Sequence, residues 1–412
     1  MIPLHEAQET VLAGCTPLIP VQVAYTEMTG RVLDQDVVAA EDVPPFRNTA
    51  VDGYAVRVAD TEQVPVELLV VDTLAAGAEP KIAVNAGEAI RIMTGAPIPS
   101  GADAVVMVED TQRVGETHVR ISRSAKMNDG VREAGSDVHA GETVFVRGTV
   151  LNAAGIGVLA SVNARTVRAF PRARVALLST GDELVVDGSP LRIGQIRESN
   201  LTMLHSMIAA TGCEVINLGM VRDDEAELER VFREVAERCD AIVTSGGVSM
   251  GDFDVVKAVL SKIATMQWMQ MAIKPAKPFA FGQLQSSDGR TIPIFGLPGN
   301  PVSSLMSFEL IARPALRMMM GHPSPYRPII SAIVDEDVQR KPDGKVHFDR
   351  VHAAWGDDGR VHVRRTGAQG SHQLAATALA NAIMAVPDGD GVQAGDTVAV
   401  TFLGPDSGAV AS

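Results

Sequence analysis

Between about residues 174 and 321, short apolar runs alternate with segments of helical spacing, and this alternation constrains the fold more than any other feature. The apolar runs are RVALLS, CEVINLGMV, DAIVTS, QWMQMAIKP and TIPIFG. The helical segments are NLTMLHSMIAATG, DEAELERVFREVAERC, DVVKAVLSKI and PVSSLMSFELIARPALRMMM. Such alternation predicts a parallel sheet with helices on both of its faces.

One of the helical segments carries its own start signal. Asp224 and Glu227 have the D-x-x-E spacing of a capping box, which predicts that the helix begins there. The apolar residues that follow share one helical face: Leu228, Val231, Phe232, Val235, Ala236 and Cys239.

The regions on either side have a different pattern. Residues of about 44–141 and 326–412 are rich in Gly, Pro, Val and Thr and contain alternating runs such as VRISRS, VHVRRT and DTVAVTFL. This pattern predicts small β domains. The phrases AGEAIRI, AGETVFV and AGDTVAV each predict a turn that leads into an alternating strand, and VLNAAGIGVLASVN has helical spacing.

Four loops fall where a sheet of this kind binds ligands, beyond the carboxyl ends of its strands. They are STGDEL, SGGVSMGDFD, KPAKP and GLPGNP. The second leaves an apolar strand through Gly246, Gly247 and one more glycine and then offers two aspartates, which is more than a structural turn needs. We interpret it as a loop that brings backbone amides and carboxylates close to a ligand.

The acids that follow two of the strands have both a structural and a functional interpretation. Thr180, Asp182 and Glu183 suit the cap of a helix, but two consecutive acids at a ligand-facing edge make metal binding an equal alternative. Asp224 is used as a helix cap, so Asp223 is left for another role.

Three further motifs each have an ordinary structural interpretation beside a functional one. Asp52-Gly53 in TAVDGYAV is a favoured hairpin turn pair, and Thr94 before a glycine suits a loop. Asn300 is a natural N-cap with Pro301 as the first helical residue, which directs backbone amides outward for an anion. His347, His352 and His362 lie in β-like polar surroundings and are expected to be solvated.

Composition narrows the class of ligand and the compartment. A net charge of -14 and an aromatic content of 4% argue against nucleic acid as a partner. No stretch has the apolar length of a membrane span, and the first residues, MIPLHEAQET, have no signal pattern. Cys15, Cys213 and Cys239 are widely spaced, so we expect three buried apolar residues and a reducing, cytoplasmic location.

The missing motifs also bear on the chemistry. The sequence contains neither a G-x-x-x-x-G-K-[ST] loop nor a G-x-G-x-x-G after a strand, and no nucleophile with a paired base stands out. Carboxylates, glycine loops and a few lysines indicate metal-assisted chemistry on a phosphate or another oxyanion. Magnesium fits better than zinc, because the available ligands are hard oxygens.

Six motifs in order give the chain a resemblance to a known family. TAVDGYAV, RIMTGAPIPSGADAVV, STGDEL, SGGVSMGDFD, IKPAKPFAFG and GLPGNPVSS together resemble the MoeA-type molybdopterin molybdenumtransferases, which include the E domain of gephyrin. The resemblance runs from about residue 3 to about residue 403.

The resemblance implies an α/β multidomain fold. It consists of a doubly wound molybdopterin-binding α/β domain, flanking small β domains and an elongated α+β arm. The expected domains are residues 1–43 plus 142–168 (I, the arm), 44–141 (II), 169–325 (III) and 326–412 (IV, β-barrel-like).

The resemblance also implies the reaction and the partners. Molybdate is inserted into adenylylated molybdopterin with Mg2+-dependent release of AMP. The expected assembly is a homodimer in which domain III of one subunit and domain II of the other share each site. Molybdopterin adenylyltransferase and molybdoenzyme-maturation proteins are candidate partners, whereas nucleic acid and membrane are not.

Motif matching gives the residues that the resemblance implies for the site. The expected catalytic residues are Asp52, Thr94, Asp137, Glu183, Asp223 and Asp254, of which Glu183, Asp223 and Asp254 are the expected metal ligands. The expected cofactor-binding residues are Arg132, Thr180, Gly181, Ser245, Gly246, Gly247, Ser249, Lys274, Lys277, Pro298, Gly299, Asn300, Pro301 and Ser371.

The chain departs from the family pattern at four positions. Ser136 stands where Glu is usual, and His372 and Ala276 each stand where Gly is usual. Gln270 stands where the family usually has Lys or Arg, four residues before Lys274. Two alternatives remain open at this stage: an interaction protein on the same scaffold, and a nucleotide pyrophosphatase that uses the same α/β domain.

Overall fold

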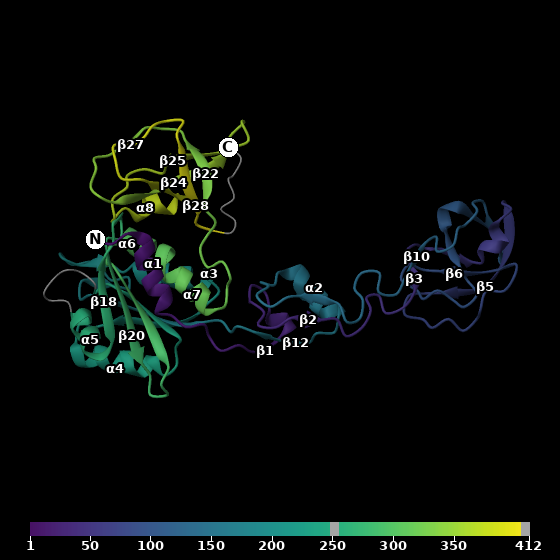
Figure 1. Ribbon diagram of the computed structural model, residues 1–412, viewed down its shortest axis with the longest axis horizontal. Helices are drawn as coiled ribbons and strands as arrows, with labels where there is room; N and C mark the ends of the chain where they lie inside the picture. The colour runs from purple at the N-terminus through teal and green to yellow at the C-terminus, as the bar shows by residue number, and fades with distance from the viewer. Residues whose placement is uncertain (248–254, 405–412) are drawn as a thin grey trace. The chain divides into compact units, whose positions relative to one another are not determined.

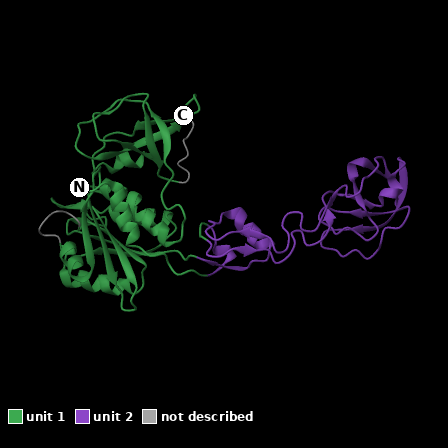
Figure 2. Cartoon of the chain, in the orientation of Figure 1, with its two compact units in different colours: residues 1–21, 30–32, 170–412 green, residues 22–29, 33–169 purple. Residues whose placement is uncertain are grey.

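A computed structural model describes residues 1–247 and 255–404 of the chain. The chain forms two compact units (Figure 2). Unit 1 contains residues 1–21, 30–32 and 170–412, and unit 2 contains residues 22–29 and 33–169. Residues 1–21 thus belong with the sheet unit rather than with the arm where the sequence predicted them. The division into four domains stays a prediction.

A six-stranded sheet forms the centre of unit 1 (Figure 1). Its order is β16-β13-β17-β21-β20-β18. The strands are β13 (Arg174–Thr180), β16 (Glu214–Val221), β17 (Ala241–Ser245), β18 (Thr265–Gln270), β20 (Pro278–Gln285) and β21 (Thr291–Leu297). The first four in this order pair in parallel, whereas β20 runs antiparallel to both its neighbours. The prediction of an all-parallel sheet is therefore wrong at β20.

Helices cover both faces of this sheet, because alternate strand residues feed two separate cores. Val175 and Leu177 face one core, with helices α1 (Leu4–Ala13), α3 (Asn200–Ala210), α6 (Pro301–Ser307) and α7 (Arg313–Met319) and the π-helical segment η4 (Phe308–Ala312). Ala176 and Leu178 face the other, with α4 (Glu225–Ala236) and α5 (Val255–Ile263). The prediction of a doubly wound domain is confirmed.

The predicted capping box forms at the start of α4. The Asp224 side chain accepts a hydrogen bond from the Glu227 backbone amide at 2.7 Å. The predicted apolar face packs into the core through Leu228, Phe232, Val235 and Ala236.

The segment QWMQMAIKP forms two strands instead of the single strand that its pattern predicted. β18 ends at Gln270 in the large sheet, and β19 (Ile273–Lys274) pairs in parallel with β24 (Val346–Trp355) of a second sheet. The chain therefore changes sheets between Gln270 and Ile273, and Gln270 and Lys274 do not belong to one continuous strand.

The second sheet of unit 1 has the order β19-β24-β25-β22-β28-β26. Its other strands are β22 (Ile330–Val334), β25 (Val361–Arg365), β26 (Ala382–Val386) and β28 (Thr397–Phe402). An additional pairing of β24 with β26 closes five of these strands into a ring around one apolar core. The short strands β23 (Val338–Gln339) and β27 (Gly391–Val392), the pair β14 (Leu184–Val185) and β15 (Ile196–Arg197), and helix α8 (Leu374–Ala378) complete the unit.

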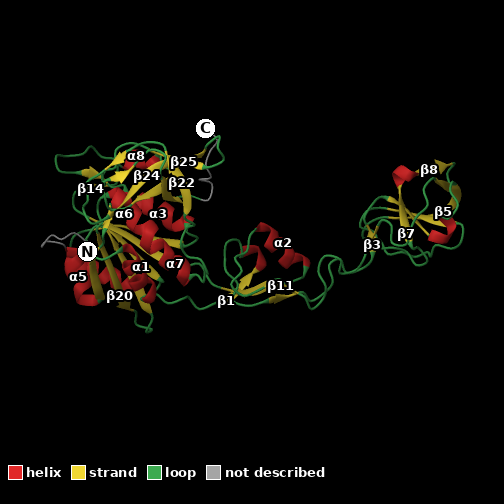
Figure 3. Cartoon of the chain, turned by 45° about the horizontal axis from the view of Figure 1, so that its top comes forward, coloured by secondary structure: helices red, strands yellow, loops and turns green. Residues whose placement is uncertain are grey.

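Unit 2 is built mainly from strands and loops (Figure 3). Its six-stranded sheet, β7-β4-β6-β5-β9-β8, contains β4 (Gly53–Val56), β5 (Val66–Leu74), β6 (Glu88–Ile92), β7 (Ala104–Met107), β8 (Thr111–Val114) and β9 (His118–Ile121). Three strand pairs accompany it: β1 (Val21–Ala24) with β12 (Thr166–Ala169), β2 (Val37–Val38) with β11 (Thr143–Phe145), and β3 (Asn48–Thr49) with β10 (Val131–Arg132). The predicted helix forms as α2 (Ala153–Ser161), capped by Asn152.

The three cysteines behave as the sequence predicted. Cys15, Cys213 and Cys239 are free and buried. Burial raises the pKa of each thiol to about 12, so all three are neutral at physiological pH. They are packing residues rather than nucleophiles.

Candidate active site at the carboxyl edge of the sheet

The predicted ligand-facing loops start at one level of the sheet. Thr180 at the end of β13 is opposite Val221 at the end of β16, and Ser245 at the end of β17 is opposite Leu297 at the end of β21. The loops that contain Glu183, Asp223, Gly246 and Gly299 therefore leave the sheet along one edge. Parallel strands place their ligand sites at this edge.

Asn200, the first residue of α3, ties two of these loops together. Its side-chain amide donates to the Ser245 hydroxyl at 2.8 Å and to the Gly299 carbonyl at 2.7 Å. Asn200 is 8% exposed; its hydrogen bond to Ser245 is buried and the one to Gly299 is partly buried. The sequence analysis did not identify this residue, because an asparagine at the start of a helix is an ordinary cap.

The strand β17 continues into a backbone turn that requires glycine. Gly246 has a φ of +89°, and a Cβ atom there would lie 3.1 Å from the Thr180 carbonyl oxygen. The loops after β13 and β17 thus approach each other through backbone, and the predicted approach of this backbone to a ligand stays a prediction. Gly247 follows in the same left-handed region, while Ser249 and Asp254 lie outside the described residues.

The Glu183 side chain folds back against the backbone of Gly181 in the same loop. Gly181 has a φ of +141°, and a Cβ atom there would meet the Glu183 carboxylate at 2.8 Å. The helix-cap interpretation of STGDEL is wrong, because the chain continues into β14 and the next helix, α3, begins only at Asn200.

Glu183 and Asp223 follow adjacent strands, and both supply the hard oxygen ligands that Mg2+ prefers. Within residues 1–247 and 255–404, no group of three His, Cys, Asp or Glu side chains is placed to hold a metal ion. The third predicted ligand, Asp254, lies outside those ranges. The two described carboxylates fit Mg2+ in chemical type, and the complete ligand set stays a prediction.

A cationic cavity of about 490 Å³ opens beside Lys274. Besides Lys274, its walls contain Arg340, Lys341, His347, Arg350 and Arg365. His347 was expected to be solvated, but its side chain is only 13% exposed and lies 3.2 Å from Asp343. Burial, with Arg340 and Lys274 nearby, lowers the pKa of His347, although Asp343 opposes this shift.

Arg350 is the residue in this cavity wall that the sequence analysis missed. It is fully buried, and its Nε and one terminal nitrogen have no hydrogen-bond partner in the described part of the chain. The other terminal nitrogen donates to the carbonyls of Ala368 and Gly370 at 3.4 and 3.3 Å. Burial lowers its pKa, but an arginine stays protonated at neutral pH. Arg350 therefore places a fixed positive charge behind the cavity surface, where it favours an anion in the cavity by electrostatic attraction.

The cavity wall continues to the edge of the sheet through Ser371. The Ser371 carbonyl accepts a hydrogen bond from the Val302 amide at 3.1 Å, and Val302 follows Gly299, Asn300 and Pro301 in GLPGNPV. This contact corrects one expectation, because an amide that was expected to face an anion is already used within the protein. Lys277 is exposed near Lys274, and its carbonyl accepts from the Met271 amide at 2.7 Å.

In unit 2, the structure brings Asp52 and Thr94 together. The Thr94 backbone amide and hydroxyl donate to Oδ1 of Asp52 at 2.7 and 2.8 Å. The backbone hydrogen bond contributes most to lowering the pKa of Asp52, followed by the bond from the hydroxyl. Asp52 is therefore an exposed, ionised carboxylate in a fixed orientation.

The hairpin interpretation of Asp52-Gly53 is wrong. Asp52 precedes β4, whose partners are β6 and β7, so no two-residue turn joins adjacent strands here. Gly53 is needed for close packing, because a Cβ atom would lie 2.1 Å from the Val106 carbonyl oxygen.

The other two predicted residues of unit 2 are exposed. Arg132 lies in β10, opposite Asn48 in the neighbouring strand β3. The Gly95 amide donates to the carbonyl of Thr49, also in β3, at 2.9 Å. The segments of Arg132, Asp52 and Thr94 are therefore neighbours. Asp137 lies farther along the chain, and its amide bonds to the Val43 carbonyl at 2.9 Å.

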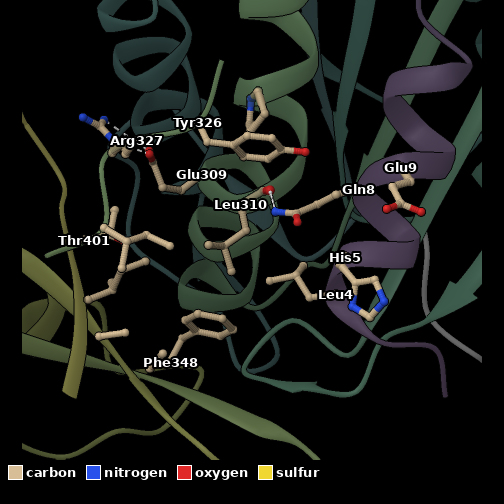
Figure 4. A pocket seen from close by; sticks show the side chains of 15 residues that line it. Leu4, His5, Gln8, Glu9, Glu309, Leu310, Tyr326, Arg327, Phe348 and Thr401 are labelled. Carbon is tan, nitrogen blue, oxygen red and sulfur yellow. Dashed lines mark hydrogen bonds and ion pairs between the residues drawn. The ribbon is translucent and has the colours of Figure 1, made fainter. Parts of the chain in front are cut away.

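Unit 1 has another large cavity, of about 500 Å³, that contains none of the predicted site residues. It lies between helix α1 and the second sheet (Figure 4). Gln8 donates to the Leu310 carbonyl at 2.8 Å, and Arg327 pairs with Glu309. The residues that line this cavity are thus different from those of the candidate site at the carboxyl edge.

Fold and site together define a multidomain α/β protein with a candidate ligand site at the carboxyl edge of its parallel strands. Three family models match the chain in order: the MoeA N-terminal region (domain I and II) over residues 2–163, a probable molybdopterin binding domain over residues 176–318, and the MoeA C-terminal region (domain IV) over residues 332–403.

Individual relatives agree with the family models. A molybdopterin molybdenumtransferase of Haemophilus influenzae is 36% identical over 97% of this chain and 98% of its own length. A molybdopterin molybdenumtransferase 2 of Mycobacterium tuberculosis is 38% identical over 93% of this chain and 95% of its own. The crystal structure of a molybdopterin biosynthesis moeA protein from Pyrococcus horikoshii has a TM-score of 0.77 at 28% identity and covers 98% of this chain and 100% of its own.

The chain therefore belongs to the MoeA family of molybdopterin molybdenumtransferases, which are transferases of molybdenum cofactor biosynthesis. The pyrophosphatase alternative does not account for the N-terminal match over residues 2–163. None of the helices in the described residues is long and apolar enough to span a membrane.

Proposed function

We propose that this protein inserts molybdate into adenylylated molybdopterin and releases AMP in a Mg2+-dependent reaction. The observation that supports this most is the continuity between the sheet edge and the cationic cavity. Asn200 donates hydrogen bonds to both Ser245 and Gly299. The amide of Val302, in the same loop-helix segment as Gly299, donates to the carbonyl of Ser371, which follows the cavity residue Gly370. A long anionic substrate needs such an extended site.

In this proposal the cationic cavity holds oxyanions. Lys274 and Lys277 are exposed and free to reorient, whereas Arg350 is fixed and buried. The exposed lysines would contact the oxyanion, and the fixed guanidinium behind the wall would add positive potential without a loss of side-chain entropy. Molybdate, as a substrate, is an anion of this kind, and the lysines offset the charge of the phosphates.

The proposed metal ligands are Glu183, Asp223 and Asp254. When bound, Mg2+ would neutralise charge on the pyrophosphate that joins AMP to molybdopterin. Thr180, Gly181, Ser245, Gly246, Gly247 and Ser249 would line the molybdopterin, because glycines and small hydroxyl residues let the backbone approach a ligand closely.

Unit 2 supplies the remaining proposed residues, Asp52, Thr94, Arg132 and Asp137. We propose a homodimer in which these residues complete the site of the partner subunit. The proposal includes four domains, with residues 1–21 moved to the sheet unit and the other boundaries as given above. It also includes a cytoplasmic location, and molybdopterin adenylyltransferase and molybdoenzyme-maturation proteins as transient partners.

Arg350→Gln tests the proposed cavity. It keeps a polar side chain of similar length but removes the charge, so the molybdate concentration for half-maximal turnover should rise about tenfold or more. Lys274→Gln, at an exposed position, should raise it as well without affecting the fold. Arg360→Gln, at an exposed turn of the same sheet, is the control. Unchanged molybdate dependence in folded Arg350→Gln and Lys274→Gln would show that the cavity does not hold molybdate.

A further inference from the structure

A third cavity, of about 580 Å³, lies at the opposite, amino edge of the large sheet. Arg174, Glu214 and Thr291 in its wall are the first residues of β13, β16 and β21. The carboxyl-edge site lies where those same strands end. The volume falls in the range of about 300–1,000 Å³ that is usual for small-molecule sites.

One side of this amino-edge cavity is apolar. Leu18, Ile292 and Met319 line it, and the Leu18 amide donates to the Met319 carbonyl at 2.8 Å, which fixes that wall. Ile19 lies in the same wall and is 82% exposed. Together with Leu18 and Ile292, the Ile19 side chain extends the apolar side of the cavity, and ligand pockets are lined mainly by such side chains.

Two arginines on the polar side are held in place by the protein. Arg174 donates through Nε and a terminal nitrogen to Asp240 at 3.1 and 2.9 Å. Arg290 donates to the carbonyls of Cys239 and Glu237 at 2.8 and 2.9 Å, just past the end of α4. Their positions are therefore fixed before any ligand arrives, but most of their donors are already used.

Arg172 differs from these two. It is half-buried in the cavity wall, and it makes no hydrogen bond or ion pair with the residues that the structure describes. The wall holds four arginines, Arg31, Arg172, Arg174 and Arg290, against two acids, Glu214 and Asp240. The cavity thus combines an excess of positive charge with one guanidinium whose donors are available.

We propose that the amino-edge cavity binds a small organic carboxylate with an apolar body. Arg172 would bind the carboxylate through two parallel N–H···O bonds, the geometry that guanidinium and carboxylate favour. The apolar body would lie against Leu18, Ile19 and Ile292. Because the site does not overlap the carboxyl edge, the proposal is independent of the proposed function.

Calorimetric titration of the full chain with 2-naphthoate tests this proposal. The matched ligands are 2-naphthamide, which keeps the apolar body without the charge, and acetate, which keeps the charge without the body. We expect 2-naphthoate to bind at least tenfold more tightly than either. Arg172→Gln should lower the affinity for 2-naphthoate about tenfold or more and leave that for 2-naphthamide unchanged. Arg230→Gln, on the exposed face of α4, should bind as the wild type does.

A second pair of variants covers the case in which Arg172→Gln does not fold. Ile19→Asp and Ile19→Asn are nearly equal in size and replace an exposed side chain, so neither disturbs the core. The aspartate should weaken 2-naphthoate binding more than the asparagine does. The proposal would be overturned if 2-naphthoate did not bind, or bound no more tightly than 2-naphthamide. It would also be overturned if Arg172→Gln bound 2-naphthoate as the wild type does, or if Ile19→Asp and Ile19→Asn bound it equally.

Discussion

Asp52 and Thr94 lie 42 residues apart in the sequence, yet one carboxylate oxygen of Asp52 accepts both the amide and the hydroxyl hydrogen of Thr94. Both residues are exposed. Water already hydrates an exposed carboxylate, so two hydrogen-bond donors from the protein are not needed to stabilise its charge. The pair therefore fixes the orientation of a negative charge, and the second oxygen remains for another partner.

Asp52→Asn should lower turnover by orders of magnitude and leave the fold unchanged. Asparagine keeps the oxygen that accepts from Thr94, so only the charge is lost. The matched control is Asp72→Asn in the same unit, where the carboxylate also accepts a backbone amide, that of Thr73 at 2.7 Å. Turnover in Asp52→Asn similar to that in Asp72→Asn would mean that Asp52 has a purely structural role.

Thr94→Ala should raise the pKa of Asp52 toward its ordinary value of 3.8, because one of the two stabilising hydrogen bonds disappears. In the wild type the pKa is lower than this value, so the folded protein binds the proton less readily than the unfolded chain. The resulting stabilisation is present above the unfolded pKa and is lost as the pH falls through the folded pKa. Carbon-13 NMR titration of the Asp52 carboxyl group measures the shift, and identical titrations in both proteins would contradict the assignment.

Asn200→Ala should lower the free energy of unfolding by about 1–3 kcal/mol, because the Gly299 carbonyl and the Ser245 hydroxyl lose a buried donor. Thermal unfolding and, separately, unfolding by urea measure this change in free energy. The control is Asn217→Ala, which removes an exposed hydrogen bond to the Gly219 amide and should cost less. Equal losses in the two variants would show that Asn200 does not tie the loops together.

Ala276→Gly should be close to neutral, although it removes a buried methyl group. Ala276 has a φ of +77°, a conformation that costs alanine roughly 1 kcal/mol and glycine almost nothing. Relief of this strain should offset the lost packing. The control is Ala280→Gly in β20, fully buried and without a positive φ, which should destabilise by about 1 kcal/mol or more. A loss at position 276 as large as that at position 280 would contradict the strain argument.

The sequence predicted the doubly wound core because strand and helix periodicities report burial directly. It did not predict β20, since PFAFGQLQ begins inside a motif that we interpreted as a ligand loop. The change of sheet between Gln270 and Ile273 was also missed, because the partner of β19 is β24, more than 70 residues later in the chain. Local patterns contain no information about such distant pairing.

For the candidate site, as for the fold, the sequence predicted the features that depend on local pattern and missed those that depend on distant contacts. Loops with unusual composition marked the sheet edge correctly, because strand ends converge there in any parallel sheet. Arg350 was missed because an arginine in an alternating strand normally faces solvent, and only the tertiary fold shows that it is buried. Asp52 looked like half of a hairpin turn until the pairing of β4 with β6 and β7 excluded it.

The most direct test of the proposed reaction is the joint measurement of AMP and of molybdenum-loaded molybdopterin. Purified protein is incubated with adenylylated molybdopterin, and Mg2+ and molybdate are each supplied or omitted. The account predicts that AMP and the loaded cofactor appear in equal amounts, and only when both are present. AMP formation no higher than in the metal-free control, or AMP released without molybdenum insertion, would contradict it.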